Sequence, residues 1–212
     1  MSKTTSLKEA AFTKAAQHTV HKIGGTSMDA VDGVLDNILI GKRKESDLYN
    51  RIFVVSAYSG MTDLLLEHKK SSEPGVFALY SDSENEWAWG DALSRVGVAM
   101  HDKNEQCLND KADLDLANRY VEERIEGVRS CLIDLHRLCS FGHFQLPEHL
   151  ATVREMLSSL GEAHSAFNTM LLLKRRGVNA VFVDLSGWRE SRTHTLNERI
   201  EQAFAGIELD HQ

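Results

Sequence analysis

The sequence predicts an α/β fold in which a mainly parallel sheet is sandwiched by helices. Short runs of β-branched residues alternate with segments of helical periodicity, and the first two runs each lead into a glycine-containing turn. Strands that alternate with helices pair in parallel, because each helix returns the chain to the sheet edge at which the next strand starts.

The first strand, turn and helix occupy residues 18–42. Residues 18–23, His-Thr-Val-His-Lys-Ile, suit a short strand that runs directly into Gly24 and Gly25, which interrupt regular structure. A helix is predicted from Asp29 to Lys42, where apolar residues recur at helical spacing. These apolar residues are Val31, Val34, Leu35, Ile38 and Leu39.

The second unit repeats this order. Residues 51–57 form a continuous β-branched and aromatic run, as expected for a strand buried on both faces of a parallel sheet. Residues 58–61, Tyr-Ser-Gly-Met, form a small-residue turn, and the leucines of residues 62–70 predict a helix. A third core strand is predicted at residues 178–184, Val-Asn-Ala-Val-Phe-Val-Asp.

A helical insertion is predicted at about residues 82–145. Apolar residues follow alternating steps of four and three from Val121 to Cys139, which predicts a long amphipathic helix. We expect it to form a helical hairpin with the stretch that begins at Trp87, and the aromatic residues Trp87 and Trp89 to anchor this insertion on the body.

Another helical region is predicted between the insertion and the third strand. Pro147 suits its first turn, and Gly177 ends it after Arg176. We expect this region to be interrupted near Gly161.

Composition excludes several classes of protein. The 212 residues are 42% hydrophobic and 26% charged, which is typical of a folded globular domain. Apolar runs such as Ile52–Val55 are far shorter than the roughly 20 residues of a membrane span. The polar extension at residues 1–17 lacks the apolar core of a secretory signal. We therefore expect a cytoplasmic protein without a membrane partner, and the net charge of −7 argues against nucleic acid.

Cysteines and histidines show no metal or disulfide pattern. Cys107, Cys131 and Cys139 are odd in number and lack metal-ligand spacing, so we interpret them as free thiols in a reducing compartment. The ten histidines, among them His164, are scattered without metal-like pairing, and we expect them at the surface or at satisfied core positions. No metal site is predicted.

The first turn has the composition of a phosphate-handling site. Lys22 stands at the end of a strand, and Gly24, Gly25, Thr26 and Ser27 follow it. Glycines let the backbone approach an anion, and a lysine offsets the charge of a transferring phosphoryl group. Taken alone, this turn is equally compatible with a purely structural connection. Neither of the commoner glycine fingerprints of nucleotide sites is present.

Two further motifs follow, and the hydroxyls and glycine of the first lie past the carboxyl end of a strand, where ligands collect in a parallel sheet. Residues 54–65 read Val-Val-Ser-Ala-Tyr-Ser-Gly-Met-Thr-Asp-Leu-Leu, and residues 161–165 read Gly-Glu-Ala-His-Ser, with Val-Phe-Val-Asp following at 181–184. Together with the Lys-Ile-Gly-Gly-Thr-Ser turn, these motifs resemble the aspartate kinase family of the amino-acid kinase superfamily, with Ile23 in place of the usual Phe. The ordered matches cover most of the chain outside residues 1–17 and 81–145.

The resemblance implies an amino-acid kinase fold, similar to that of carbamate kinase, and a reaction. With Mg²⁺, the γ-phosphate of ATP would pass to the β-carboxylate of L-aspartate to give 4-phospho-L-aspartate. It also implies site residues: Lys22 at the transferring phosphoryl group, Gly24, Gly25, Thr26 and Ser27 around the ATP phosphates, Ser56 and Thr62 at aspartate, and Glu162 at its α-ammonium group.

Each of the implied aspartate contacts also has a purely structural interpretation. Ser56 could satisfy the end of a strand, Thr62 could cap a helix, and Glu162 could be a first-turn carboxylate that the helix dipole favours. Arg189 and Arg192 could approach an anionic substrate.

The resemblance also covers the extent of the protein. The resemblance implies that residues 18–212 correspond to the amino-terminal part of the kinase domain, and we expect the nucleotide-binding half and the regulatory domains usual in the family to be absent from this sequence. We expect this chain alone to be an inactive fragment, and the full-length enzyme to be a homo-oligomer. The amino-acid sequences of both turns and of residues 73–76, Glu-Pro-Gly-Val, resemble those of the aspartate kinases associated with ectoine synthesis. Another amino-acid kinase and a non-catalytic amino-acid-binding module are the alternatives.

Overall fold

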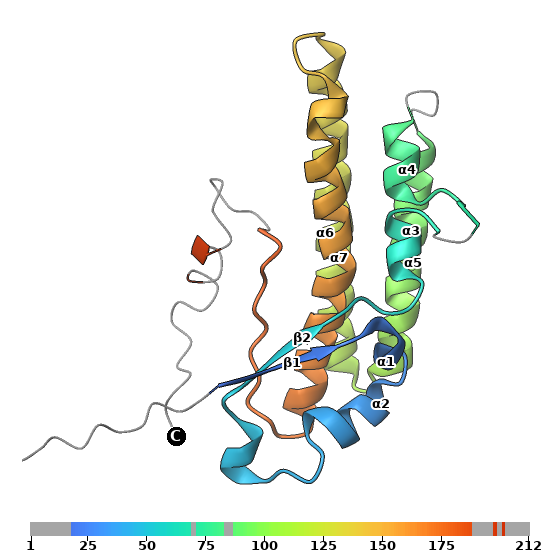
Figure 1. The fold of residues 1–212 in the computed structure, drawn as a ribbon. Helices are drawn as coiled ribbons and strands as arrows, with labels where there is room; N and C mark the ends of the chain where they lie inside the picture. Colours follow the sequence, from blue (N-terminus) through green and yellow to red (C-terminus); the bar gives the residue numbers. More distant parts are fainter. Residues whose placement is uncertain (1–17, 69–70, 83–86, 188–196, 199–200, 202–212) are drawn as a thin grey trace, which may run out of the picture.

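A computed structural model describes residues 18–68, 71–82, 87–187, 197–198 and 201 (Figure 1). Two parallel strands lie at the base of the molecule, and long helices stand over them. This arrangement confirms the predicted α/β class and the helical insertion. In chain order the elements are β1 (Thr19–Ile23), α1 (Gly25–Met28), α2 (Val31–Val34), the π-helix η1 (Leu35–Leu39), the 3-10 helix η2 (Glu45–Leu48), β2 (Arg51–Val55), α3 (Met61–Leu65), α4 (Val76–Ser81), α5 (Ala88–Cys107), α6 (Lys111–Ser140) and α7 (Leu146–Arg175).

The two strands pair in parallel, as predicted, with Ile23 opposite Val55. The sheet face that carries these two residues packs on α2, η1 and the end of α7 in one apolar cluster. On the opposite face Val20 is 66% exposed and Val54 is 51% exposed. The described helices therefore cover one face of the sheet, and the expected burial of the second strand on both faces is not found in this part of the chain.

The prediction of a third strand at residues 178–184 is wrong, because the structure assigns no strand there. The Val178 N–H turns back to the Leu173 carbonyl at 3.0 Å, around Gly177 at a φ of +79°. A strand exists only through hydrogen bonds to a neighbouring strand. Within the described residues, β1 pairs with β2 alone. Side chains hold this segment instead, as the site below shows.

The insertion forms a helical hairpin, as predicted, and α7 returns along α6 (Figure 1). Trp89 is buried and meets the Tyr80 ring of α4 edge to face at 5.5 Å, so it anchors the insertion as expected. Trp87 is 72% exposed and does not. The apolar stripe of α6 is buried at Val121, Ile125, Val128 and Leu132, which confirms the amphipathic helix.

Helix α7 is continuous, so the expected interruption near Gly161 is wrong. This glycine instead marks a close approach of α7 to the turn after β2. A Cβ atom at Gly161 would lie 3.0 Å from the Ala57 Cβ and 3.2 Å from side-chain atoms of Met61 and Leu65. The residue therefore serves packing, at the modest cost in helix propensity that an internal glycine carries.

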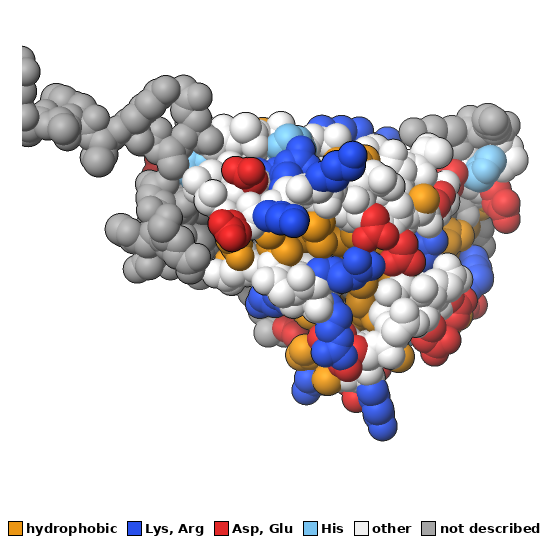
Figure 2. Space-filling view, turned by 90° about the horizontal axis from the view of Figure 1, so that it is seen from below, with side chains coloured by type: hydrophobic (Ala, Val, Ile, Leu, Met, Phe, Trp, Pro, Cys, Tyr) orange, Lys and Arg blue, Asp and Glu red, His pale blue; other side chains and the backbone are white. Residues whose placement is uncertain are grey.

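The face of the molecule seen from below is mixed in charge, with some hydrophobic side chains exposed between the charged ones (Figure 2). No helix in the described part of the chain is long and apolar enough to cross a membrane. Figure 2 shows Lys and Arg side chains interleaved with Asp and Glu on the face seen from below. Arg175 pairs with Asp110, and Arg176 lies 2.8 Å from Asp36, which ties the end of α7 to the start of α6 and to η1. Exposed pairs of this kind contribute less than about 1 kcal/mol each.

We expect Gly161→Val to lower the free energy of unfolding by about 1–3 kcal/mol, because the added atoms overpack the contact with Ala57. Urea denaturation followed by circular dichroism measures this loss. The matched control is Gly33→Val, since a Cβ atom at Gly33 meets nothing within 4 Å. Equal losses of stability in both variants would show that the close contact with Ala57 does not exclude a larger side chain at position 161.

Candidate active site

The two glycine-containing turns lie side by side at the carboxyl end of the sheet (Figure 1). The Ser56 N–H donates to the Ile23 carbonyl at 3.0 Å, which extends the parallel pairing past the strands. A Cβ atom at Gly25 would lie 3.0 Å from the Ala57 carbonyl oxygen, so the missing side chain permits this approach. The two turns therefore form one surface.

The first turn presents a cation and free donors. Lys22 is exposed near the end of β1, and its Nζ lies 3.6 Å from the position that a Cβ on Gly24 would take. Gly24 is extended, and its carbonyl accepts the N–H groups of Ser27 and Met28 at 3.0 and 3.2 Å. The Thr26 and Ser27 side chains are exposed. An ammonium group beside exposed hydroxyls and a glycine backbone can hold an anion.

The second turn presents two half-buried hydroxyl side chains, Ser56 and Thr62. Thr62 is not a helix cap, because α3 begins after Gly60, which takes a φ of +78° and provides no side-chain cap. The backbone of Ser56 satisfies the strand end through its N–H, and neither side-chain hydroxyl bonds to another residue that the structure describes. Both hydroxyls are thus available to a ligand.

Glu162 lies in the middle of α7, sixteen residues after Leu146 begins the helix, so no helix dipole explains its carboxylate. The Ser165 hydroxyl donates to the Ser56 carbonyl at 2.7 Å and to the Glu162 carbonyl at 2.9 Å. Glu162 shares a helix face with Ala166 and Leu173, which pack in the cluster beneath the sheet. Glu162 is exposed, and the part of α7 that carries it lies against the second turn.

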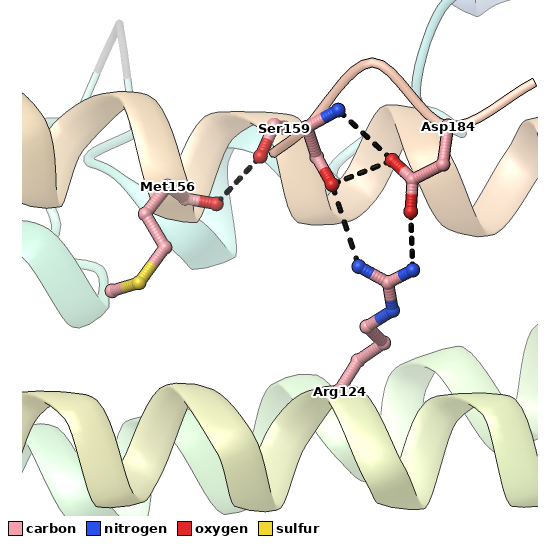
Figure 3. Close-up of polar contacts among 5 residues, drawn as sticks. Arg124, Met156, Ser159 and Asp184 are labelled. Carbon is pink, nitrogen blue, oxygen red and sulfur yellow. Dashed lines mark hydrogen bonds and ion pairs between the residues drawn. The ribbon is translucent and has the colours of Figure 1, made fainter. Parts of the chain in front are cut away.

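A buried arginine, which the sequence prediction missed, holds the segment after α7 (Figure 3). Arg124 of α6 is 7% exposed and pairs with Asp184, and it donates to the Ser186 hydroxyl at 3.4 Å. The Ser186 N–H and hydroxyl donate to the Asp184 carboxylate at 2.9 and 2.6 Å. Burial raises the pKa of Asp184, but the hydrogen bonds from Ser186 and the charge of Arg124 outweigh it and leave that pKa below its ordinary value.

Aromatic rings complete this attachment. Tyr120 stacks on Phe167 with centroids 4.3 Å apart, and Phe182 meets both rings edge to face. These contacts fix residues 178–187 beside α7 without strand pairing. A signal for Arg124 existed in the sequence, because it lies on the apolar stripe three residues after Val121.

A cavity of about 400 Å³ lies beside the Arg124 network, between α6, α7 and Gly187. Ala163 lines it, but its neighbour Glu162 does not, and neither do the two turns. The cavity is therefore separate from the surface that the turns form. Arg189 and Arg192, which were expected near an anionic substrate, lie outside the described residues.

His164 is buried in the core between α7, α5 and the second turn. Its Nε2 lies 2.7 Å from the Asn104 side-chain oxygen, and its ring meets the Tyr58 ring edge to face at 5.5 Å. Burial, followed by the nearby His101 and Lys103, lowers the pKa of His164 to about 3. The imidazole is therefore neutral at physiological pH. The three cysteines are free thiols, as predicted.

Comparisons with known proteins agree with the motifs. The amino acid kinase family matches residues 17–206 of the chain. Aspartate kinase Ask_Ect of Stutzerimonas stutzeri (strain A1501) is 52% identical over 195 residues, which cover 92% of this chain and 41% of that protein. The chain thus spans about two fifths of the length of this curated relative. No solved structure matches the chain.

We expect the free energy of unfolding to fall as the pH is lowered from 7.5 to 5. The unfolded histidine titrates near pH ~6.5, whereas folded His164 has a pKa of about 3, so only the unfolded state gains this proton in the interval. Stability present at neutral pH is therefore lost on acidification, by about 2 kcal/mol at pH 5 from this residue.

Urea denaturation at each pH measures this loss, with His164→Gln as the comparison. The variant lacks the titrating ring, so its stability should depend less on pH by that amount. Asp184, whose pKa is also lowered, gives up its contribution only below its ordinary value of 3.8 and leaves this interval unaffected. Equal pH dependence in both proteins would contradict a buried neutral imidazole.

Proposed function

Because the chain belongs to the amino acid kinase family, we propose that it forms the aspartate-binding and phosphoryl-contacting part of an aspartate kinase. The observation that carries this proposal is the meeting of three separate segments at one sheet edge. Lys22, the free hydroxyls of the second turn and the exposed carboxylate of Glu162 come from β1, the turn after β2 and α7. The identity to an aspartate kinase supports the choice of substrate.

Substrate selection follows from the charges at this edge. The Glu162 carboxylate would pair with the α-ammonium group of aspartate, which a plain dicarboxylic acid lacks. The Ser56 and Thr62 hydroxyls would donate to the substrate carboxylates. Charge-assisted hydrogen bonds of this kind are shorter and stronger than neutral ones.

The proposed reaction needs no general base, because the aspartate β-carboxylate is already ionised at neutral pH. Its oxygen would attack the γ-phosphorus of ATP as the bond to the ADP oxygen breaks. Lys22 would offset the charge on the transferring group, while the glycine backbone and hydroxyls of residues 24–27 bind the ATP phosphates. Positioning and charge neutralisation then carry the catalysis.

The reaction class uses Mg²⁺, which bridges and neutralises the nucleotide phosphates. Within residues 18–68, 71–82, 87–187, 197–198 and 201, no three His, Cys, Asp or Glu side chains are grouped to hold a metal ion. We therefore assign no residue of this chain to the metal.

The proposed assignment to the ectoine-associated subgroup rests on the sequences of both turns, which lie at the proposed site. Residues 73–76 support the subgroup less strongly, because packing requirements alone account for the residue types at Gly75 and Val76. A Cβ atom at Gly75 would lie 2.6 Å from the Leu64 carbonyl oxygen, and Val76 is fully buried.

Calorimetric titration of the purified chain with L-aspartate, L-glutamate and succinate tests the proposal. Binding of aspartate alone supports it, since glutamate differs in length and succinate lacks the ammonium group. Preference for glutamate would indicate another amino-acid kinase. Aspartate binding without phosphate transfer in a full-length protein built on this sequence would indicate a non-catalytic module, and no binding would contradict the proposal.

We expect Lys22→Met, in a full-length kinase built on this sequence, to lower kcat by several orders of magnitude while aspartate affinity changes less. The reason is that the lysine charge acts mainly on the transition state. A coupled ADP-release assay measures kcat, and exposed Lys44→Met serves as the control. A near-normal kcat in the Lys22 variant would remove this residue from the mechanism.

Glu162→Gln should weaken aspartate binding by about 1.5–3 kcal/mol, roughly 10- to 150-fold in Kd, because the ammonium group loses its charged partner. Calorimetric titration with aspartate measures the change. Glu155→Gln, at another exposed position of α7, is the matched control and should bind normally. Equal affinity in the Glu162 variant and the control would assign the ammonium group to another residue.

A further inference from the structure

A buried polar cluster, formed by Asn104, His164 and Asn168, lies beneath the second turn. All three side chains are fully buried. The Asn104 side-chain oxygen lies 2.7 Å from both the His164 Nε2 and the Asn168 amide nitrogen. The Asn104 amide in turn donates to the Asn118 side chain of α6 at 2.9 Å. The cluster therefore connects α5, α6 and α7.

The proton of His164 is fixed by these partners. An amide oxygen only accepts, so the His164 Nε2 must carry the proton and donate it to Asn104. The His164 Nδ1 and the Asn168 side-chain oxygen have no hydrogen-bond partner among the described residues. A protonated ring would bury a second N–H without an acceptor, which agrees with the lowered pKa.

The cluster also touches the second turn. The His164 ring packs edge to face on Tyr58, which is 1% exposed. The Tyr58 hydroxyl lies near Asn168 and Cys107, but these contacts lack the geometry of a hydrogen bond. Tyr58 lies in the middle of the second turn, two positions after Ser56 and two positions before Gly60.

Stability does not explain such a cluster. Buried polar atoms without partners cost free energy, and apolar side chains of similar volume would fill the same space without that cost. What a directional hydrogen bond adds is a defined geometry. The His164 to Asn104 bond adds a directional restraint on the rotation of α7 relative to α5, beside the contacts of Gly161 and Ser165 with the second turn.

The rotation of α7 also affects the direction of Glu162, which lies two residues before His164. A helix is rigid over two residues, so a fixed direction for His164 also fixes the direction in which Glu162 projects. The Glu162 carboxylate is exposed and has no hydrogen bond or ion pair to another described residue that could hold it in place. We propose that His164 is a positioning residue: through its hydrogen bond to Asn104 it holds Glu162 in register with the second turn for binding of the amino-acid substrate. This inference rests on the proposed function.

The test compares two variants of the full chain by calorimetric titration with L-aspartate. His164→Gln keeps a donor at the Nε2 position, whereas His164→Asn reaches only the Nδ1 position and loses the donor. We expect Kd for aspartate to rise about 10-fold or more in His164→Asn and to stay within about 3-fold of the unmodified chain in His164→Gln. A purely structural role would lower the melting temperature but leave Kd unchanged in folded protein.

Circular dichroism establishes which variants fold. If His164→Asn does not, Asn118→Ala tests the same linkage from its far end, because it frees the Asn104 amide, and Kd should rise beyond the 3-fold margin allowed for His164→Gln. An aspartate Kd equal to that of the unmodified chain in a folded His164→Asn or Asn118→Ala variant overturns the inference. Glu162→Gln separates the two proposals. If it weakens binding and the His164 variants do not, only the positioning role fails, whereas no aspartate binding by the unmodified chain removes both.

Discussion

The contact between the middle of α7 and the turn after β2 brings the helix of the candidate site to the glycine-containing turns. Gly161 lets the helix approach Ala57, and the Ser165 hydroxyl then reaches the Ser56 carbonyl at 2.7 Å. These two interactions reinforce each other, because the hydrogen bond requires the short distance that the glycine permits. They bring the part of α7 that carries Glu162 to the second turn. A residue that seemed to break a helix is the one that brings the helix to the site.

The sequence allowed the strands, the glycine turns and the long helix of the insertion to be predicted, because each depends on local periodicity. The prediction failed where contacts with residues distant in the sequence determine the secondary structure. Residues 178–184 have the composition of a strand, but side chains of Phe182 and Asp184 hold them in place of a paired strand. The continuity of α7 was missed for a related reason: Gly161 has a low helix propensity, and tertiary packing overrides it.

In the candidate site, too, local motifs could be predicted from the sequence, whereas contacts between distant residues could not. Lys22 and the turn residues could be identified from motifs, since each motif is contiguous. Motifs could not decide between a ligand contact and a helix cap for Thr62, or between a ligand contact and a dipole effect for Glu162. Helix boundaries exclude the cap for Thr62 and the dipole effect for Glu162, and ligand contact stays a prediction for both residues. The position of Arg124 on an apolar stripe was a signal in the sequence, but the partners of Arg124 and Asn104 could not be assigned because Asp184 and His164 lie 60 residues away.

The insertion is part of the site's construction, although the sequence suggested a mere elaboration. The last turn of α5 supplies Asn104 to the buried cluster and Lys103 to the turns. The Lys103 Nζ lies 3.6 Å from Asp29, whose carboxylate accepts the Ser59 N–H at 3.2 Å. One helical turn of the insertion therefore supports both glycine-containing turns and α7. Each of these contacts is weak alone, but together they restrict the same few backbone groups. Such restriction is what a site needs when its catalysis depends on positioning.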